Sequence, residues 1–205
     1  LARRIESVDL VGGASSLRTL AQDRGIAGKV SYIISSHNIE HIPDPIAFLQ
    51  DCGTVLKAGG YLSMAVPDRR ACFDFFRPFT TLSQWIQAHF ERRTRPTEAQ
   101  LFELECLGAD YQRGATRSAG FDIARESPEA LIPFNRLKSS LAMWRQRIVD
   151  ATEDYRDTHC WAFTPSSFEL LMRDCWYLGL VPLHMSALTP VNNHEFYVHL
   201  QNQRG

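Results

Sequence analysis

Residues 30–67 constrain the fold of this chain more than any other segment, because they read as a β-strand, an α-helix and a second β-strand in succession. In order, they contain an apolar run at 30–34, Pro43-Asp44-Pro45, apolar residues at helical spacing over 46–56, Gly59-Gly60, and a second apolar run at 62–66. Nearly continuous apolar runs are typical of parallel strands covered on both faces. We predict a crossover in which Gly59 ends the helix and the two strands are parallel.

Polar residues follow both predicted strands. Ser35, Ser36, His37 and Asn38 end the first strand, and Pro67-Asp68-Arg69-Arg70 ends the second. In open α/β sheets, ligands bind in the crevice beyond the carboxyl ends of the strands. We therefore expect the two tips to lie side by side and to form one wall of a ligand site.

Three short pieces of sequence carry a resemblance to a known family. They are Ile39-Glu40-His41-Ile42-Pro43-Asp44-Pro45, Val55-Leu56-Lys57-Ala58-Gly59-Gly60 and Ala65-Val66-Pro67-Asp68-Arg69-Arg70. In this order and spacing they resemble the S-adenosylmethionine-dependent methyltransferases of the Rossmann-like class, especially the small-molecule branch, with Ala58 in place of the usual Pro. The tail resembles the family too, because Thr164 and Pro165 are suited to open a helix and extended runs follow at 180–188 and 194–200.

The resemblance covers about residues 30–78 and 159–201. It implies an α/β fold with a Rossmann-like, mostly parallel sheet, a closing antiparallel strand pair and a helical insertion after the fifth strand. We expect a single methyltransferase-like domain over residues 1–205, N-terminally incomplete, with 79–158 as an insertion or lid that shapes the substrate pocket. Within 79–158 we expect helices over 83–92 and 97–107, a loop over 108–120, and a helical segment over 128–155 that includes Leu131.

The family's main cofactor motif, a Gly-rich turn after the first strand, is missing from the sequence ahead of residue 30. Residues 8–13 correspond better to the family's third strand, so Gly12 and Gly13 are expected to border the adenine. Because the chain begins with Leu1 rather than Met, we expect the start of the native protein to be absent from it. The alternative is a domain that has lost the motif and acts as a catalytically degenerate binding or partner protein.

The resemblance places cofactor contacts at the first tip. Ser35, Ser36, His37 and Asn38 match positions that line the methionine end of S-adenosylmethionine, although the same residues also suit a strand end and a turn cap. His41 is the best candidate for a general base, because imidazole titrates near neutral pH. The alternative is that His41 packs against the sheet and bonds Glu40.

Substrate contacts are expected from the second tip and from the return to the sheet. Asp68 and Arg70 are suited to orient an anionic or hydroxylated substrate, and the alternative is a solvated turn. His159 is expected to face the pocket, whereas Trp161 is expected in the core.

A metal is not predicted. His37 to His41 spells His-x-x-Glu-His, a zinc motif of metallopeptidases, but that motif requires one long helix, which Pro43 and Pro45 disfavour. Some members of the resembled family hold a divalent ion with Glu-x-x-Glu-His at this place. Here His37 replaces the first Glu, which suits magnesium less well.

Net charge and cysteine content limit which partners and which cellular compartment the sequence predicts. With 22 basic and 23 acidic residues, the net charge of −1 gives no electrostatic reason to expect nucleic acid or a membrane surface as partner. No apolar stretch approaches the roughly 20 residues that span a bilayer. Five scattered cysteines without a Cys-x-x-Cys pair favour a reducing, cytoplasmic setting. We expect a small-molecule substrate, and a homodimer is compatible with the sequence.

Overall fold

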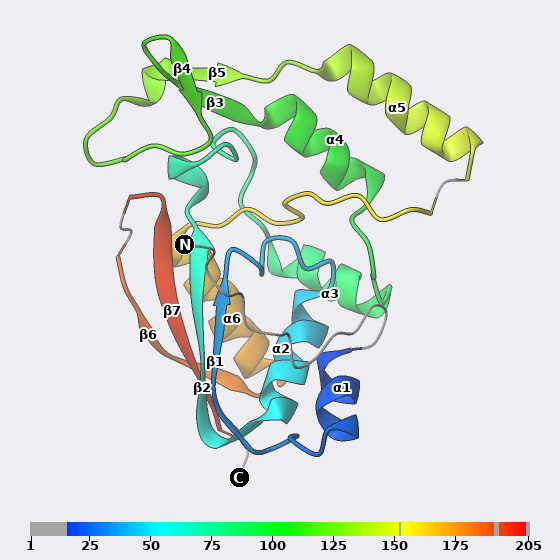
Figure 1. The fold of residues 1–205 in the computed structure, drawn as a ribbon, viewed down its shortest axis with the longest axis vertical. Coiled ribbons are helices and arrows are strands. Elements are labelled where there is room, and N and C mark those ends of the chain that lie inside the picture. The colour runs from blue at the N-terminus through cyan, green and yellow to red at the C-terminus, as the bar shows by residue number, and fades with distance from the viewer. Residues whose placement is uncertain (1–15, 152, 191–192, 204–205) are drawn as a thin grey trace, which may run out of the picture.

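The computed structural model describes residues 16–151, 153–190 and 193–203, which form a helix-covered sheet and a smaller unit packed at one end of it (Figure 1). The helices are α1 (Leu17–Asp23), α2 (Pro45–Val55), α3 (Leu82–Phe90), α4 (Glu98–Leu107), α5 (Leu137–Val149) and α6 (Pro165–Tyr177), with 3₁₀ turns η1 (Arg69–Ala71) and η2 (Pro128–Ala130). The strands are β1 (Val30–Ser36), β2 (Leu56–Pro67), β3 (Ala109–Arg113), β4 (Thr116–Ser118), β5 (Leu131–Pro133), β6 (Leu183–Leu188) and β7 (Glu195–Asn202).

The main sheet has the strand order β1-β2-β7-β6. β1 and β2 are parallel, as expected for the crossover, whereas β2–β7 and β7–β6 are antiparallel. The described part of this sheet is therefore mixed, and a mostly parallel sheet for the whole domain stays a prediction. The expected third strand over 8–11 lies outside the described residues. The antiparallel pair β6–β7 occurs where the two extended runs of the tail predict it.

The core lies between this sheet and the helices α2, α3 and α6, of which α2 and α3 stand to one side of the sheet in Figure 1. Strand β7 shows the alternation clearly, because Phe196, Val198 and Leu200 are buried while the residues between them are half-buried. Fully burying each such side chain stabilises the fold by about 1.5–3 kcal/mol. On the opposite face, Tyr32 and Ile34 of β1 remain exposed.

The crossover helix α2 begins as expected and ends earlier than expected. The Asp44 side chain accepts a hydrogen bond from the Ala47 amide, and Pro45 fills the first helical position. The helix ends at Val55, so Gly59 does not end it. Instead, Gly59 has a φ of +74° inside an irregular start of β2. The reason lies far away in sequence. The side-chain amide of Asn202, on β7, donates hydrogen bonds to the carbonyl oxygens of Gly53 and Leu56, at 3.0 and 2.9 Å, and so provides partners for carbonyl groups at the end of the helix.

Residues 79–158 are not mostly helical. Strands β3, β4 and β5 form a second, antiparallel sheet, so the expected loop over 108–120 contains the β3–β4 hairpin, and Leu131 lies in β5 rather than in a helix. Helix α3, from the same segment, sends Trp85 into the main core with no exposed surface. Short strands without an extended alternating pattern resemble loops in sequence, which explains the error. Among the described residues, no helix is long and apolar enough to cross a bilayer.

Candidate functional site

The tips of β1 and β2 lie side by side, as the sequence predicts. Ser36 pairs with Ala65, and the His37 amide donates to the Ala65 carbonyl oxygen at 3.0 Å. Just beyond β2, the Asp68 amide donates to the carbonyl oxygen of His194 at 2.9 Å. Three segments that are distant in sequence therefore meet at this edge of the sheet.

A fourth segment, 158–163, is fixed to the turn after β1. The Glu40 carbonyl oxygen accepts from the Cys160 amide at 2.6 Å, and the indole nitrogen of Trp161 donates to the Ile42 carbonyl oxygen at 2.6 Å. Trp161 is buried in the core, as predicted. These bonds bring the His159 ring to 4.7 Å, centroid to centroid, from the His41 ring.

A cavity of about 500 Å³ opens beyond the tips. The strand ends contribute His37 and Pro67, the returning segments contribute His159 and His194, and the β3–β4 hairpin with the residues after it closes the far side. Aromatic rings of Phe73 and Phe121 also line it. The volume falls within the range of about 300–1,000 Å³ that is typical of small-molecule sites.

Glu40 is the most unusual group near this cavity. Its side chain has no exposed surface, and neither carboxylate oxygen has a hydrogen-bond partner within the described ranges. Burial raises the pKa of this carboxyl, and the backbone amide of Glu40 itself opposes the shift, followed by the charges of His159, His41 and His37. Its Oε1 atom lies 3.6 Å from Nδ1 of His37 and 4.0 Å from Nε2 of His41.

His159 belongs to a buried charge network. Its Nδ1 atom lies 2.5 Å from Oδ2 of Asp74, and Nη1 of Arg77 donates to Oδ1 of Asp74 at 2.7 Å. Burial of Asp74 opposes ionisation, but the hydrogen bond from His159 and the charge of Arg77 outweigh it and lower the pKa of Asp74. The ionised carboxylate thus orients the imidazole that lines the cavity.

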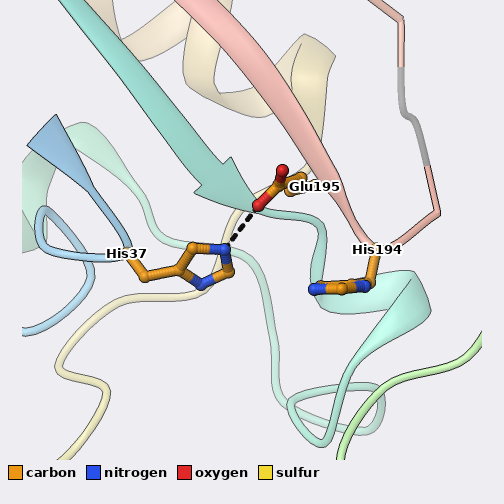
Figure 2. A group of neighbouring side chains, drawn as sticks. All are labelled: His37, His194 and Glu195. Carbon is orange, nitrogen blue, oxygen red and sulfur yellow. Dashed lines mark hydrogen bonds and ion pairs between the residues drawn. The ribbon is translucent and has the colours of Figure 1, made fainter. Parts of the chain in front are cut away.

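His37, His194 and Glu195 form a second cluster, drawn in Figure 2. His37 follows β1, and its Nε2 atom lies 2.5 Å from Oε2 of Glu195 at the start of β7. The rings of His37 and His194 have centroids 5.9 Å apart. For Glu195, burial opposes ionisation, but hydrogen bonds from Tyr197 and His37 outweigh it and lower its pKa.

The remaining residues expected at the cofactor and as the base are placed as follows. Ser35 is half-buried, and its hydroxyl accepts a hydrogen bond from the side-chain amide of Asn38 at 3.2 Å, whereas Ser36 is exposed. His41 is half-buried, with Nδ1 3.0 Å from Oδ1 of Asp157, and it stands next to His159 rather than among the residues that line the cavity. Gly12 and Gly13 lie outside the described residues.

Asp68 and Arg70 bond each other instead of lining the cavity. Asp68 is fully buried, and its carboxylate accepts from Nε and Nη2 of Arg70 at 3.0 and 2.6 Å. Arg70 keeps 45% of its side chain exposed. Substrate contact by this pair stays a prediction, and the geometry gives Asp68 a turn-stabilising contact through the Arg70 amide as well.

Sequence reasoning missed His194, Glu195 and Asp74. We expected His194 to lie in a strand, but it precedes β7 and lines the cavity. The signal that was available is the predicted antiparallel pair at the end of the chain, because an antiparallel strand begins at the edge where its neighbour ends, and Glu195 lies opposite Pro67. Asp74 gave no signal, since nothing local marks its pairing with His159.

Comparison with known proteins places the chain in a family. A crystal structure of an S-adenosylmethionine-dependent methyltransferase from Methanosarcina mazei matches with 13% identity and a TM-score of 0.38, covering 87% of this chain and 62% of that one. Phosphoethanolamine N-methyltransferase 2 from Haemonchus contortus, in complex with S-adenosyl-L-methionine, matches with 14% identity and a TM-score of 0.25, covering 87% of this chain and 34% of that one. At these TM-scores neither likeness supports an argument, and no curated protein matches the sequence. The family model described as a methyltransferase domain, however, matches residues 5–175, and the chain therefore belongs to the methyltransferase domain family.

Proposed function

We propose that this protein transfers a methyl group from S-adenosylmethionine to oxygen, nitrogen or carbon of a small molecule that binds in the cavity beyond β1 and β2. The observation that carries the proposal is the family match over residues 5–175. The position of the cavity supports it, because the cavity lies beyond the carboxyl ends of two parallel strands, where α/β sheets bind ligands.

The residues at the first tip fit the methionine end of such a cofactor. Ser35, Ser36 and Asn38 offer hydroxyl and amide groups, and His37 reaches the cavity itself. When bound, the cofactor supplies a methyl group on a positively charged sulfur, which keeps the bonding electrons when the acceptor takes the methyl group. The Phe73 and Phe121 rings on the cavity wall suit a cation or a flat acceptor.

The chain's own contribution is then chiefly to hold two reactants in line, which alone removes much of a barrier. His159 is proposed to contact the acceptor, because it lines the cavity and is oriented by Asp74. His41 remains our proposed base; its ring lies next to His159, outside the residues that line the cavity, and its Nδ1 atom lies 3.0 Å from Oδ1 of Asp157.

Isothermal titration of the full chain with S-adenosylmethionine, and with its demethylated product, tests this proposal. We expect both to bind. Ser36→Leu, at the tip of β1, should weaken binding by about tenfold, or about 1.4 kcal/mol. Ser31→Leu, the same change at the other end of β1, is the matched control and should leave binding unchanged. If neither ligand binds to the wild-type chain, the enzymatic proposal fails and the degenerate binding protein takes its place.

A further inference from the structure

We propose that His37, His194 and Glu195 form a binding site for a divalent metal ion of the zinc class at the mouth of the cavity (Figure 2). One ligand atom from each of the three residues lies within 4.8 Å of the others. Two imidazole nitrogens and one carboxylate oxygen suit zinc, whereas magnesium prefers oxygen ligands alone. The inference concerns the proposed methyltransferase cavity, but it does not require methyl transfer to occur.

The other nitrogen of His37 already faces a carboxylate. Nε2 points toward Glu195, and Nδ1 lies 3.6 Å from Oε1 of Glu40. Metal-binding histidines commonly present their second nitrogen to a carboxylate, which fixes the ring and raises its basicity. Glu40 is fully buried and has no hydrogen-bond partner among the described residues, so an oriented His37 would give this carboxylate its interaction. The φ of +46° at His37 is costly for a residue other than glycine, and such strain is often found at functional sites.

The Glu195 carboxylate is likewise oriented by a neighbouring side chain. Its Oε1 atom accepts a hydrogen bond from the Tyr197 hydroxyl at 2.6 Å, which leaves Oε2 directed at His37. Tyr197 and Glu195 are two residues apart on β7, so the strand itself keeps the phenol on the same side as the carboxylate. The Glu195 carboxylate is therefore held by a hydrogen bond from a residue that is not itself a proposed ligand, as metal-bound carboxylates commonly are.

The third proposed ligand, His194, is held in place through its backbone. The carbonyl oxygen of His194 accepts from the Asp68 amide, and its ring packs on Gly120, where an added Cβ would come to 3.4 Å from Cγ of His194. His37 and His194 both line the cavity. A tetrahedral ion held by these three side chains would keep its fourth position free for another ligand, which is the pattern of reactive rather than structural zinc sites. An ion there would hold an oxygen or nitrogen atom of a molecule in the cavity.

Titration with zinc chloride tests the site directly. The full chain, without a histidine tag and after treatment with a chelator, is titrated by calorimetry in the absence of S-adenosylmethionine. We expect about one equivalent of zinc to bind, and His194→Ala and Glu195→Gln each to weaken binding by about 100-fold or more. His184→Ala, on β6 and outside the cavity, is the matched control for loss of a surface imidazole and should bind as the wild type does. Glu40→Gln, which acts through His37, should weaken binding by about 10–100-fold.

Two results would overturn the assignment. One is zinc binding that survives in both His194→Ala and Glu195→Gln. The other is binding that is lost in His41→Ala but kept in His194→Ala, which would move the ion to the neighbouring group of Glu40, His41 and His159. Zinc should also raise the thermal midpoint of the wild type and not that of Glu195→Gln, so a variant that loses its fold is recognised independently. Because zinc is titrated alone, failure of methyl-donor binding leaves this result standing.

Discussion

Asp74→Asn is the substitution whose cost follows most directly from the structure. Asp74 is 1% exposed and Arg77 2% exposed, and the two are joined by the 2.7 Å bond between Nη1 and Oδ1. Removing the carboxylate charge leaves the guanidinium buried without its main partner, which typically costs about 3–5 kcal/mol. Oε2 of Glu103, at 3.7 Å from Nη2 of Arg77, offsets part of that cost. We therefore expect a loss near the lower end, about 3 kcal/mol.

Urea unfolding followed by tryptophan fluorescence measures this loss, and a loss of about 3 kcal/mol corresponds to a fall of roughly 6–12 °C in Tm for a chain of this length. Glu126→Gln is the control. It breaks an equally short pair, 2.6 Å between Arg113 Nε and Glu126 Oε1, but one that lies on the surface. Exposed pairs are screened by water, so this loss should be much smaller. Equal losses in the two variants would show that burial of the Asp74 network does not determine its energy.

Three further predictions concern packing, the end of helix α2 and thiol reactivity. Gly53→Ala should destabilise the fold by about 1–3 kcal/mol in urea unfolding, because the new Cβ would come to 2.2 Å from Cγ of Pro182; Gly120→Ala, with no atom closer than 3.4 Å, should cost clearly less. Asn202→Ala should cost about 1–3 kcal/mol in the same assay, since it leaves buried carbonyl oxygens at the end of α2 unpaired, and no loss would mean that water replaces the amide. Cys106 should be the first cysteine to react with iodoacetamide at about pH 8, as followed by mass spectrometry, because the other four cysteines are buried. Burial also raises the pKa of Cys52, Cys160 and Cys175 to about 12. Comparable rates at all five cysteines would contradict the burial of those four.

The sequence predicted well those features that depend on neighbours along the chain. Asp44 and Thr164 each accept a hydrogen bond from an amide three residues later, as their positions before a proline and an apolar helical pattern predict. The parallel pairing of β1 with β2 follows from the crossover between them. The end of α2 was missed because its carbonyl groups are satisfied by Asn202, which lies far away in sequence.

The candidate site was only half predictable for the same reason. His37 and His159 were expected near a ligand because each follows or precedes a recognisable element, and both line the cavity. Their partners, Glu195 and Asp74, come from segments whose placement depends on tertiary pairing. No spacing rule links His159 to Asp74, 85 residues away.

The antiparallel strand β7 explains why so many ionisable groups gather at one edge of the sheet. In a parallel sheet only the residues that follow each strand reach the ligand-binding edge. β7 runs the other way, so the residues that precede it reach the same edge, and Glu195 lies opposite Pro67 at the tip of β2. Reversal of one strand thus adds His194 and Glu195 to the histidine already supplied by β1. A shift of β7 by one residue would turn the Glu195 side chain to the wrong face of the sheet, because side chains alternate along a strand. The buried residues Phe196, Val198 and Leu200 oppose that shift, so the packing of the core also fixes the geometry of the candidate site.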